Sequence, residues 1–459
     1  MNLAQGPSPG RERWPFSFGL FAASIHLASQ ARVLRIDCRP MSQDPTPVAS
    51  VRSRPHFVIV GAGFAGISAA KALKGVDIDI TIIDKNNFHT FQPLLYQVTT
   101  ATLDADEVSE TLPTIFAKQP NVTVRVDEVT TGDLDAKTVT LKGDGAGETI
   151  SYDYLMISAG AKANFFGIEG MEEHSWPLYT LADALRLRAN LTGDLDTAAA
   201  KGSVDPADST VVIVGGGPTG VEMAGALIAM EPKTPNGPKL RVVLVEALPR
   251  LLPMFSEESS QTTLEDLRKR GVEVLLDTKV QSADANGVSF ASGERIETRT
   301  IVWGAGVRAN PLGAELGLET GRGGAILVDE NLRVKGRSEV FAAGDNCTLD
   351  PPPAQPIPPV CPTAMQMGKH VGRQVKALVA GQSLSPFKFW NKGSMAVIGK
   401  GNAVVELTKP KVKLSGVFAW LMWLAVHNFY LDSMRNRARV VGSWLSAYIK
   451  SEKSQSSAV

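Results

Sequence analysis

Short apolar runs and a helix-like segment alternate between residues 56 and 83. The run His56–Val60 is mostly apolar and β-branched, which predicts a buried strand. A helix-like segment follows at Ile67–Lys74, and a second apolar run, Asp79–Ile83, predicts the next strand. A strand, a helix and a strand in this order predict a parallel sheet in a doubly wound α/β fold.

The turn between the first strand and the helix has the spacing Gly61-Ala-Gly63-Phe-Ala65-Gly66, which is typical of a dinucleotide-binding turn. Gly61 would allow the tight turn, Gly63 would let the backbone approach a pyrophosphate, and Gly66 would let the helix pack on the strand. The positive end of the helix dipole would then face the phosphates. Asp84 follows the second strand, where a carboxylate can accept a hydrogen bond from a ribose hydroxyl. A purely structural glycine turn does not require this whole order of elements.

The same order of elements recurs in the middle of the chain. It consists of a strand at Thr210–Val214, a turn with Gly215, Gly217 and Gly220, a helix at Val221–Met230 and a strand at Arg241–Val245. Two such units predict two bound dinucleotides. Glu246 ends the last strand, and a carboxylate there accepts from the ribose 2′-hydroxyl of NADH and repels the 2′-phosphate of NADPH. We therefore expect NADH as the second dinucleotide.

Charge and cysteine content exclude several classes of protein. The 47 Lys and Arg residues balance 47 Asp and Glu residues, so no bulk charge attracts nucleic acid, and no nucleic-acid partner is expected. The three cysteines, Cys38, Cys347 and Cys361, form no CxxC pair and have no zinc-ligand spacing. They also exclude a disulfide framework, which fits a reducing compartment. We expect no metal, and we expect Cys347 and Cys361 to be buried packing residues.

Residues 1–53 precede the first predicted strand. Arg11 and Arg13 stand before an apolar run at residues 16–28, which has the outline of a signal peptide. His26 and other polar residues interrupt the run, and Met41 is a second plausible start. We expect residues 1–53 to be disordered or an upstream extension, with export as the alternative.

Two further predicted strands resemble the flavin-binding marks of the glutathione-reductase-like flavoproteins. Tyr154–Gly160 is a strand that ends in a turn of small residues, and Glu339–Asp345 is a strand that ends in Gly-Asp. The resemblance implies that the first dinucleotide is FAD and that Asp345 binds its ribitol. Asp345 could equally cap a following helix. No cysteine lies between Phe64 and Gln97, where disulfide reductases of this superfamily carry a redox dithiol, so electrons should pass directly from flavin to an acceptor.

From about His56 to the C-terminus the chain resembles the type II NADH:quinone oxidoreductases, the non-proton-pumping NADH dehydrogenases of bacteria and mitochondria. Five segments carry the resemblance: Asn87–Gln97, Gly217–Glu222, Val302–Arg308, Lys392–Gly399 and Ala419–His427. The last two are not general flavoprotein motifs. The resemblance implies FAD-dependent oxidation of NADH, with two-electron transfer to a membrane quinone and without proton pumping.

The resemblance also implies roles for individual residues. Glu222 would lie near the nicotinamide end, where its alternative role is that of an ordinary acid near a helix N-terminus. Gln366 and Lys392 would be catalytic residues for the quinone. The cofactor-binding residues would be Gly61, Gly63, Ala65, Gly66, Asp84, Lys85, Ala159, Gly160, Gly344, Asp345, Gly215, Gly217, Gly220, Glu246 and Gly306. The family has Ala-Gln where this chain has Cys361-Pro362, and its second glutamine aligns with Gln366.

The C-terminal segment has the composition of a membrane-surface helix. Residues 417–431 are apolar apart from His427 and Asn428, and they are fewer than the roughly 20 residues that span a bilayer. Aromatic and basic residues surround them: Trp420, Trp423, Trp444, Lys409, Lys411, Lys413, Arg435, Arg437 and Arg439. These predict peripheral attachment to the cytoplasmic face of the cell membrane. The alternative is a core or dimer helix, and a homodimer is possible.

The expected architecture has an FAD domain at residues 54–165 and 306–385, an inserted NADH domain at 166–305, and a C-terminal membrane-anchoring region at 386–459. Residues 193–209 and 350–359 are expected to be surface segments without regular structure. Because neither glycine turn lies in the tail, deletion after Leu414 is expected to leave both dinucleotide folds intact.

Two alternatives to quinone reduction remain open. One is a soluble NADH oxidase or ferredoxin reductase with a similar core and another acceptor. The other is a nucleotide-binding or redox-sensing module without turnover, which two intact dinucleotide sites disfavour.

Overall fold

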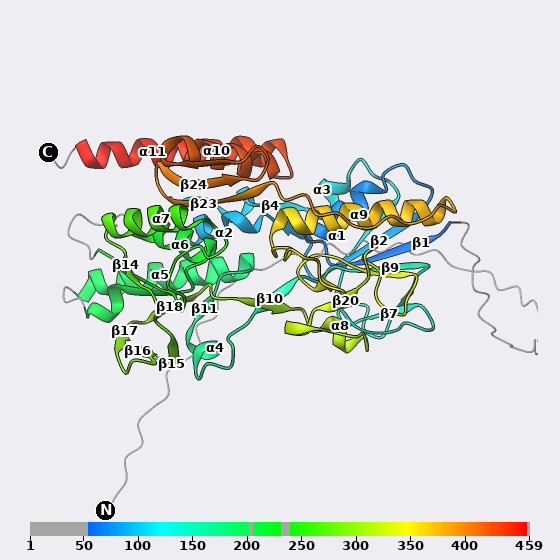
Figure 1. Ribbon diagram of the computed structural model, residues 1–459, viewed down its shortest axis with the longest axis horizontal. Coiled ribbons are helices and arrows are strands. Elements are labelled where there is room, and N and C mark those ends of the chain that lie inside the picture. Colours follow the sequence, from blue (N-terminus) through cyan, green and yellow to red (C-terminus); the bar gives the residue numbers. More distant parts are fainter. Residues whose placement is uncertain (1–53, 202–204, 231–238, 457–459) are drawn as a thin grey trace, which may run out of the picture. The chain divides into compact units, whose positions relative to one another are not determined.

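The computed structural model describes residues 54–201, 205–230 and 239–456, which all belong to one compact unit. The expectation for residues 1–53 lies outside the described residues. Within the unit, two five-stranded parallel sheets carry the two glycine turns (Figure 1). This topology confirms the α/β fold with two dinucleotide-binding folds.

The first sheet has the order β21-β9-β1-β2-β5, and every neighbouring pair is parallel. Its strands are β1 (His56–Val60), β2 (Asp79–Asp84), β5 (Val122–Val126), β9 (Tyr154–Ile157) and β21 (Val340–Ala342). Helix α1 (Phe64–Ala72) packs along α9 (Cys361–Val379). All five residues of β1 are buried, as their apolar run predicts.

The second sheet has the order β11-β18-β12-β13-β14 and is also parallel throughout. Its strands are β11 (Trp176–Pro177), β12 (Thr210–Val214), β13 (Arg241–Val245), β14 (Glu273–Leu275) and β18 (Thr300–Trp303). The accompanying helices are α5 (Leu181–Lys201), α6 (Pro218–Ile228) and α7 (Glu257–Lys269). All these strands lie between β9 and β21 in the sequence. The second sheet therefore interrupts the chain that builds the first.

Smaller elements complete these two halves. The short sheets are β3-β4 (Phe88–Thr90, Ser109–Thr111), β6-β7-β8 (Val129–Asp133, Thr138–Leu141, Thr149–Ser151), β15-β16-β17 (Val280–Asp284, Gly287–Phe290, Arg295–Glu297), β10-β19 (Ala161–Ala163, Val307–Ala309) and β20-β22 (Ile326–Val328, Cys347–Leu349). The short helices are α2 (Leu95–Thr99), α3 (Leu112–Phe116), α4 (Met171–His174) and α8 (Leu312–Glu315), with 3-10 turns at Gln92–Leu94, Ala105–Glu107, Pro206–Ser209 and Arg322–Gly324.

Part of the linker predicted at residues 193–209 has regular structure. Residues 193–201 continue helix α5, and a 3-10 turn follows at Pro206–Ser209. A glycine inside a helix costs only about 1 kcal/mol relative to alanine, and the three alanines at 198–200 favour the helix. Residues 350–359 form no helix or strand and are largely exposed, as predicted.

The tail forms an antiparallel sheet of β23 (Gly393–Gly399), β24 (Asn402–Leu407) and β25 (Val412–Ser415), followed by α10 (Gly416–Tyr430) and α11 (Met434–Ser456). Figure 1 shows this sheet between the tail helices and α6 of the second half. A Cβ built at Gly225 of α6 would lie 1.9 Å from the carbonyl oxygen of Ile398 in β23. The helix therefore approaches the tail sheet as closely as a glycine allows.

Helix α10 has one face in the core and one face in solvent. Ala419 and Trp423 have no exposed surface and belong to the same hydrophobic cluster as Val221 and Met223 of α6. Phe418 on the same helix is 78% exposed. Deletion after Leu414 would uncover this cluster, so the burial of Ala419 and Trp423 argues against the expectation that the tail can be removed without disturbing the dinucleotide folds. The tail is a part of the core with an exposed apolar face.

Two of the three arginines expected to face lipid have protein partners. The Arg437 guanidinium donates to the carbonyls of Phe429 and Leu431 at the end of α10, with distances of 2.6 and 3.0 Å. Arg439 forms a paired ion bridge with Asp106 at 2.7 and 3.0 Å. Among the described residues, no helix is both long and apolar enough to cross a membrane.

We expect Trp423→Ala to lower the free energy of unfolding by about 3–5 kcal/mol, because it removes a fully buried side chain. Phe418→Ala on the same helix should cost less than about 1 kcal/mol, because this side chain is exposed. Urea unfolding followed by circular dichroism measures both. Equal and small losses would show that the tail is separable from the core.

Candidate active site

The first glycine turn has the geometry that dinucleotide binding requires. Gly61 has a φ of +101°, and a Cβ there would lie 2.3 Å from the carbonyl oxygen of Ser158. A Cβ at Gly66 would lie 1.9 Å from the Gly61 carbonyl oxygen, so the helix touches the turn. Gly63 is the N-cap residue of α1, with open space where its Cβ would lie, and no side chain caps the helix. The first backbone N–H groups of α1 are therefore available to a phosphate.

Asp84 lies at the turn, as the sequence predicts, and holds it in place. One carboxylate oxygen accepts from the backbone N–H of Ala62 and the other from that of Asn86, each at 2.8 Å. Burial raises the pKa of Asp84, and the neighbouring Lys85 opposes this shift. Asp84 thus connects the end of β2 to the turn after β1.

The two flavin marks meet at the same edge of the first sheet. Ala159 and Gly160 follow β9, and Gly344 and Asp345 follow the adjacent parallel strand β21. A Cβ at Gly344 would lie 3.5 Å from the Cβ of Ala65 in α1, so the two turns are in contact. Parallel strands present their carboxyl ends at one edge, which is where α/β folds bind ligands.

The carboxylate of Asp345 is partly buried and has one described side-chain partner. The Tyr179 hydroxyl donates to Asp345 Oδ2 at 3.1 Å, and burial raises the pKa of Asp345. Burial raises the thiol pKa of Cys347 and Cys361 strongly, and the charge of Asp345 adds to the effect. Neither cysteine is therefore a thiolate at neutral pH, which argues against a redox pair; both side chains are only partly buried, less than expected.

The second glycine turn repeats the first. Gly215 has a φ of +113°, and a Cβ at Gly220 would lie 1.8 Å from the Gly215 carbonyl oxygen. Gly217 is the N-cap residue of α6, with open space where its Cβ would lie and no side-chain cap. Glu246 accepts from the N–H groups of Gly216 and Leu248 at 2.6 and 2.8 Å. The turn and its acid are therefore assembled in the same way as Asp84 and the first turn.

Gly306 follows strand β18 of the second sheet. A Cβ at Gly306 would lie 2.8 Å from the ring of Phe166. Phe166 is 62% exposed and lies against Trp303, with ring centroids 6.2 Å apart. An aromatic side chain therefore covers the position that the sequence assigns to a cofactor.

Glu222 is enclosed between α6 and the tail. Its side chain is buried, and the backbone N–H of Val397 in β23 donates to Oε1 at 3.4 Å. Burial raises the pKa of Glu222 to about 8. Burial also raises the pKa of Tyr96, and the charge of Glu222 adds to that shift. Glu222 therefore holds a proton at neutral pH. The motif Gly217–Glu222 alone does not indicate that the tail encloses this side chain.

Tyr96, Gln97 and Trp444 join this site, and the sequence analysis assigned them no role there. The Gln97 amide donates to the Tyr96 hydroxyl at 2.8 Å, and the Trp444 indole of α11 donates to Gln97 Oε1 at 2.7 Å. Tyr96 and Gln97 end the motif Asn87–Gln97, so a signal existed. Their connection to a tail residue was not predictable from that motif.

Gln366 and Lys392 meet at Trp390. The Gln366 amide pairs with the Trp390 backbone, donating to its carbonyl at 3.1 Å and accepting from its N–H at 2.9 Å. Lys392 Nζ lies 5.2 Å from the centroid of the Trp390 ring and donates to the Tyr430 hydroxyl at 3.0 Å. In the part of the chain that the structure describes, no hydrogen bond joins Glu222 to either residue. The three catalytic candidates therefore form two groups.

The Cys361-Pro362 departure lies at the start of α9. Helix α9 begins at Cys361, so Pro362 occupies its first turn. Proline is tolerated there because the first backbone N–H groups of a helix have no intrahelical acceptor. The substitution therefore leaves α9 and Gln366 in place, but it removes an amide side chain.

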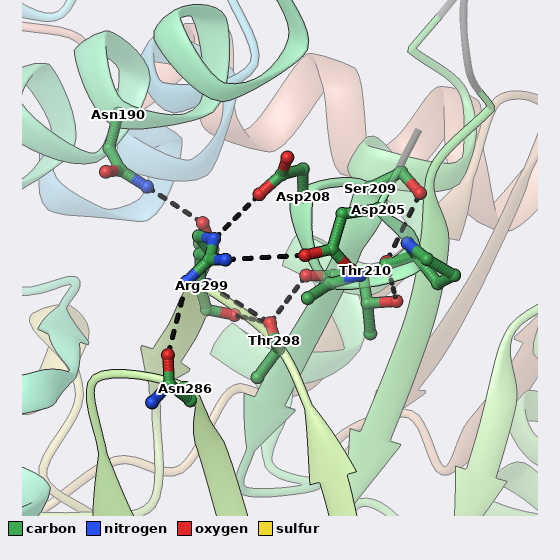
Figure 2. Close-up of polar contacts among 11 residues, drawn as sticks. Asn190, Asp205, Asp208, Ser209, Thr210, Asn286, Thr298 and Arg299 are labelled. Atoms are coloured by element: carbon green, nitrogen blue, oxygen red, sulfur yellow. Dashed lines mark hydrogen bonds and ion pairs between the residues drawn. The ribbon is translucent and has the colours of Figure 1, made fainter. Parts of the chain in front are cut away.

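A separate cavity of about 510 Å³ lies beside α4, β11 and the start of α5. Charged residues line it, and several are paired with one another. Arg186 contacts Asp183 at 2.6 Å, and Figure 2 shows Arg299 bonded to Asp208 and Asp205, at 2.7 and 3.4 Å. The two Arg299 pairs attach the Pro206–Ser209 turn and its N-cap Asp205 to the start of β18, which points to a structural role.

Comparison with known protein families gives two matches that together cover most of the chain. Residues 55–368 match the pyridine nucleotide-disulphide oxidoreductase family. Residues 391–451 match the NDH2 C-terminal domain family.

The curated relatives carry one type of name. The type II NADH:quinone oxidoreductase NdhA of Mycobacterium tuberculosis is 37% identical over 420 residues, covering 86% of this chain and 87% of the relative. The type II NADH:quinone oxidoreductase Ndh of the same organism is 34% identical over 437 residues, covering 90% and 92%.

Solved structures share the fold. NDH2 from Plasmodium falciparum in complex with NADH aligns with a TM-score of 0.79 at 20% identity, over 86% of this chain and 98% of that chain. The sulfide:quinone oxidoreductase of Aquifex aeolicus aligns with a TM-score of 0.69 at 19% identity, over 83% and 92%.

We expect Glu222→Gln to change how stability depends on pH. Burial raises the Glu222 pKa from 4.5 to about 8, so between these values the folded state binds a proton that the unfolded state releases. Stability from this group is therefore present below pH 4.5 and is lost as pH rises towards 8. Glutamine has a similar shape but does not ionise, so the variant does not lose this stability as the pH rises. At pH 8 it should therefore be more stable than the wild type by roughly 2–5 kcal/mol. Urea unfolding from pH 5 to 9 measures the difference, and parallel profiles would contradict it.

Proposed function

The chain belongs to the pyridine nucleotide-disulphide oxidoreductase family and is a relative of the type II NADH:quinone oxidoreductases, and on this premise we propose that it oxidises NADH through bound FAD and reduces a membrane quinone. One observation carries the proposal. The tail segment that matches the family's C-terminal domain encloses Glu222 on the helix that begins at the second glycine turn.

The residues at the first turn fit FAD. The uncapped start of α1 offers backbone N–H groups to a pyrophosphate, and Asp345 offers a partly buried carboxylate to a ribitol hydroxyl. The second turn fits NADH in the same way, with Glu246 toward the adenosine ribose. When bound, FAD accepts a hydride from NADH and passes two electrons to the acceptor.

We assign the protein's own contribution to two groups of residues. Reduction of a quinone to a quinol by NADH consumes one proton from solution. Glu222 holds a proton at neutral pH because burial raises its pKa to about 8, so it is the proposed proton source. Gln366 and Lys392 lie together on Trp390 and are the proposed contacts for the quinone ring.

We propose peripheral attachment to the cytoplasmic face of the cell membrane, and the exposed face of the tail supports attachment to a membrane surface. Phe418, Phe429, Met434 and Leu445 are 78%, 66%, 73% and 58% exposed. Apolar side chains on interfacial helices enter the boundary between headgroups and acyl chains. Lys409, Lys411 and Lys413 precede α10 and could contact anionic lipid. A homodimer stays a prediction.

We also propose the domain division given above. An FAD domain at 54–165 and 306–385 is supported by the pairing of β21 with β9, and an inserted NADH domain at 166–305 is supported by the second sheet. A C-terminal region at 386–459 is supported by the separate tail sheet.

The full-length protein should release FAD on denaturation and oxidise NADH with a quinone or with ferricyanide. Glu222→Gln should retain FAD and ferricyanide turnover, because ferricyanide accepts electrons without protons, and should slow quinone turnover roughly 100-fold. Steady-state assays with both acceptors test this. Turnover with oxygen or ferredoxin but with no quinone would favour the soluble oxidoreductase, and a chain without flavin would refute the proposal.

We expect Glu246→Gln to weaken discrimination against NADPH. Removing the negative charge should raise kcat/KM for NADPH relative to NADH by about 10-fold, within the 1–3 kcal/mol of a polar contact. Glu273→Gln is the control, because it removes a charge from β14, where Glu273 pairs with Arg241 at 2.7 Å. Initial rates with both nucleotides measure the ratio. Efficient use of NADPH by the wild type would contradict the role given to Glu246.

A further inference from the structure

Phe166 is an exposed aromatic side chain at the edge of the second dinucleotide fold. It is 62% exposed, and the proposed reaction uses no property of it. Its neighbour Phe165 is partly buried and packs against the core around Trp303, with ring centroids 5.4 Å apart. Phe165 therefore joins this loop to the second sheet, and most of the Phe166 ring is left open to solvent.

The backbone at Phe166 has a conformation that favours other residue types. The N–H of Ile168 donates to the carbonyl of Phe165 at 3.0 Å, which closes a four-residue turn with Phe166 and Gly167 at its centre. Both central residues have a positive φ, +53° and +71°. Turns with this pair of signs prefer Asn-Gly, and a bulky residue at a positive φ is a genuine outlier. A phenylalanine that opposes the preference of its own turn indicates that the side chain is required.

The tip of the Phe166 ring lies on the backbone that follows β18. A Cβ at Gly306 would lie 2.8 Å from Cζ of the ring, so only a glycine leaves room for it. The preceding residue, Ala305, touches the second glycine turn, because a Cβ at Gly215 would lie 2.7 Å from the Ala305 Cα. Only Ala305 and Gly306 therefore separate the Phe166 ring from the turn that would bind a pyrophosphate.

The order of strands in the second sheet indicates which half of NADH would pass this ring. Glu246 at the end of β13 would hold the adenosine ribose, and the pyrophosphate would lie at the turn after β12. In the sheet, β18 lies beside β12 on the side opposite β13. The rest of the nucleotide, which is its nicotinamide half, would therefore continue towards the end of β18 and the Phe166 ring.

Two short strands lead from this ring to the flavin marks of the first half. β19 begins directly after Gly306 and pairs with β10, which ends three residues before Phe166. Beyond the other end of β19, the Asn310 N–H donates to the carbonyl of Gly160 at 3.0 Å. Phe166 therefore lies beside the connection between the second glycine turn and the flavin-binding edge, and a nicotinamide would have to follow this connection to reach a flavin.

We propose that Phe166 is a substrate-binding residue whose ring stacks against the nicotinamide half of NADH. The inference rests on the NADH and FAD sites of the proposed function. A phenylalanine ring offers a flat apolar face to a planar partner and loses little side-chain entropy when it is fixed. The turn with two positive φ angles holds this face at Gly306, which explains why a phenylalanine occupies a position that favours asparagine.

The test is equilibrium binding of NAD⁺ to the oxidised, FAD-loaded protein, measured by isothermal titration calorimetry. Phe166→Leu keeps an apolar side chain without a flat ring and should raise the NAD⁺ dissociation constant roughly fivefold. Phe166→Tyr keeps the ring and should stay within about twofold of the wild type. ADP-ribose lacks nicotinamide, so its dissociation constant should be the same for the wild type and both variants.

Phe166→Asn separates a role of the side chain from a role of the backbone. Asparagine tolerates a positive φ, so this variant relieves the turn while it removes the ring. Its melting temperature should lie within about 2 °C of the wild type, and its NAD⁺ dissociation constant should rise as in Phe166→Leu. A residue that only shaped the turn would leave NAD⁺ binding intact when asparagine replaces it.

Two results would overturn the inference. One is an NAD⁺ dissociation constant that is unchanged in both Phe166→Leu and Phe166→Asn. The other is a loss of ADP-ribose binding equal to the loss of NAD⁺ binding, because Phe166 would then support the whole nucleotide site. A wild-type protein that binds neither ligand would refute the proposed function together with the inference. A protein that shows the expected binding pattern but reduces no quinone would refute the proposed function alone.

Discussion

The contact between helix α6 and strand β23 determines how the tail and the second dinucleotide fold depend on one another. A Cβ at Gly225 would lie 1.9 Å from the Ile398 carbonyl, so a larger residue there would separate the helix from the tail sheet. Glu222 lies one turn before Gly225 on α6. Its carboxylate accepts from the backbone N–H of Val397, the residue before Ile398 in β23. The close approach therefore both completes the core and removes Glu222 from water, which is the cause of its raised pKa.

The motif Asn87–Gln97 connects three parts of the chain. His89 contacts the first glycine turn, Gln92 donates to the Tyr179 carbonyl at 3.0 Å, and Gln97 accepts from Trp444 of α11. Tyr179 in turn donates to Asp345, so Gln92 is connected to this carboxylate through one intermediate. A short segment therefore connects the first glycine turn, the residues before α5 and the tail. Its polar side chains have buried partners, and loss of one partner would leave the other unsatisfied.

The sequence predicted the elements whose pattern is local. The strands at 56–60, 210–214 and 241–245 begin and end as predicted, and both glycine turns have the required geometry. The tail was not predictable in the same way, because an apolar run is compatible with lipid and with a core. Trp423 is in the core and Phe418 is in solvent, five residues apart on one helix. The partners of Glu222 come from the tail, 175 positions away for Val397, so no local pattern indicates them.

The effect of having Cys361-Pro362 in place of the family's Ala-Gln depends on where these two residues lie in helix α9. In the interior of a helix a proline would remove a hydrogen bond and cost about 3 kcal/mol or more. Here Pro362 is in the first turn of α9, so Gln366 stays in register one turn further along and keeps both bonds to the Trp390 backbone. What is lost is one amide, not the helix. Gln366 therefore keeps its contact with Trp390, whose ring lies 5.2 Å from Lys392 Nζ, and the two proposed quinone residues stay together despite the departure.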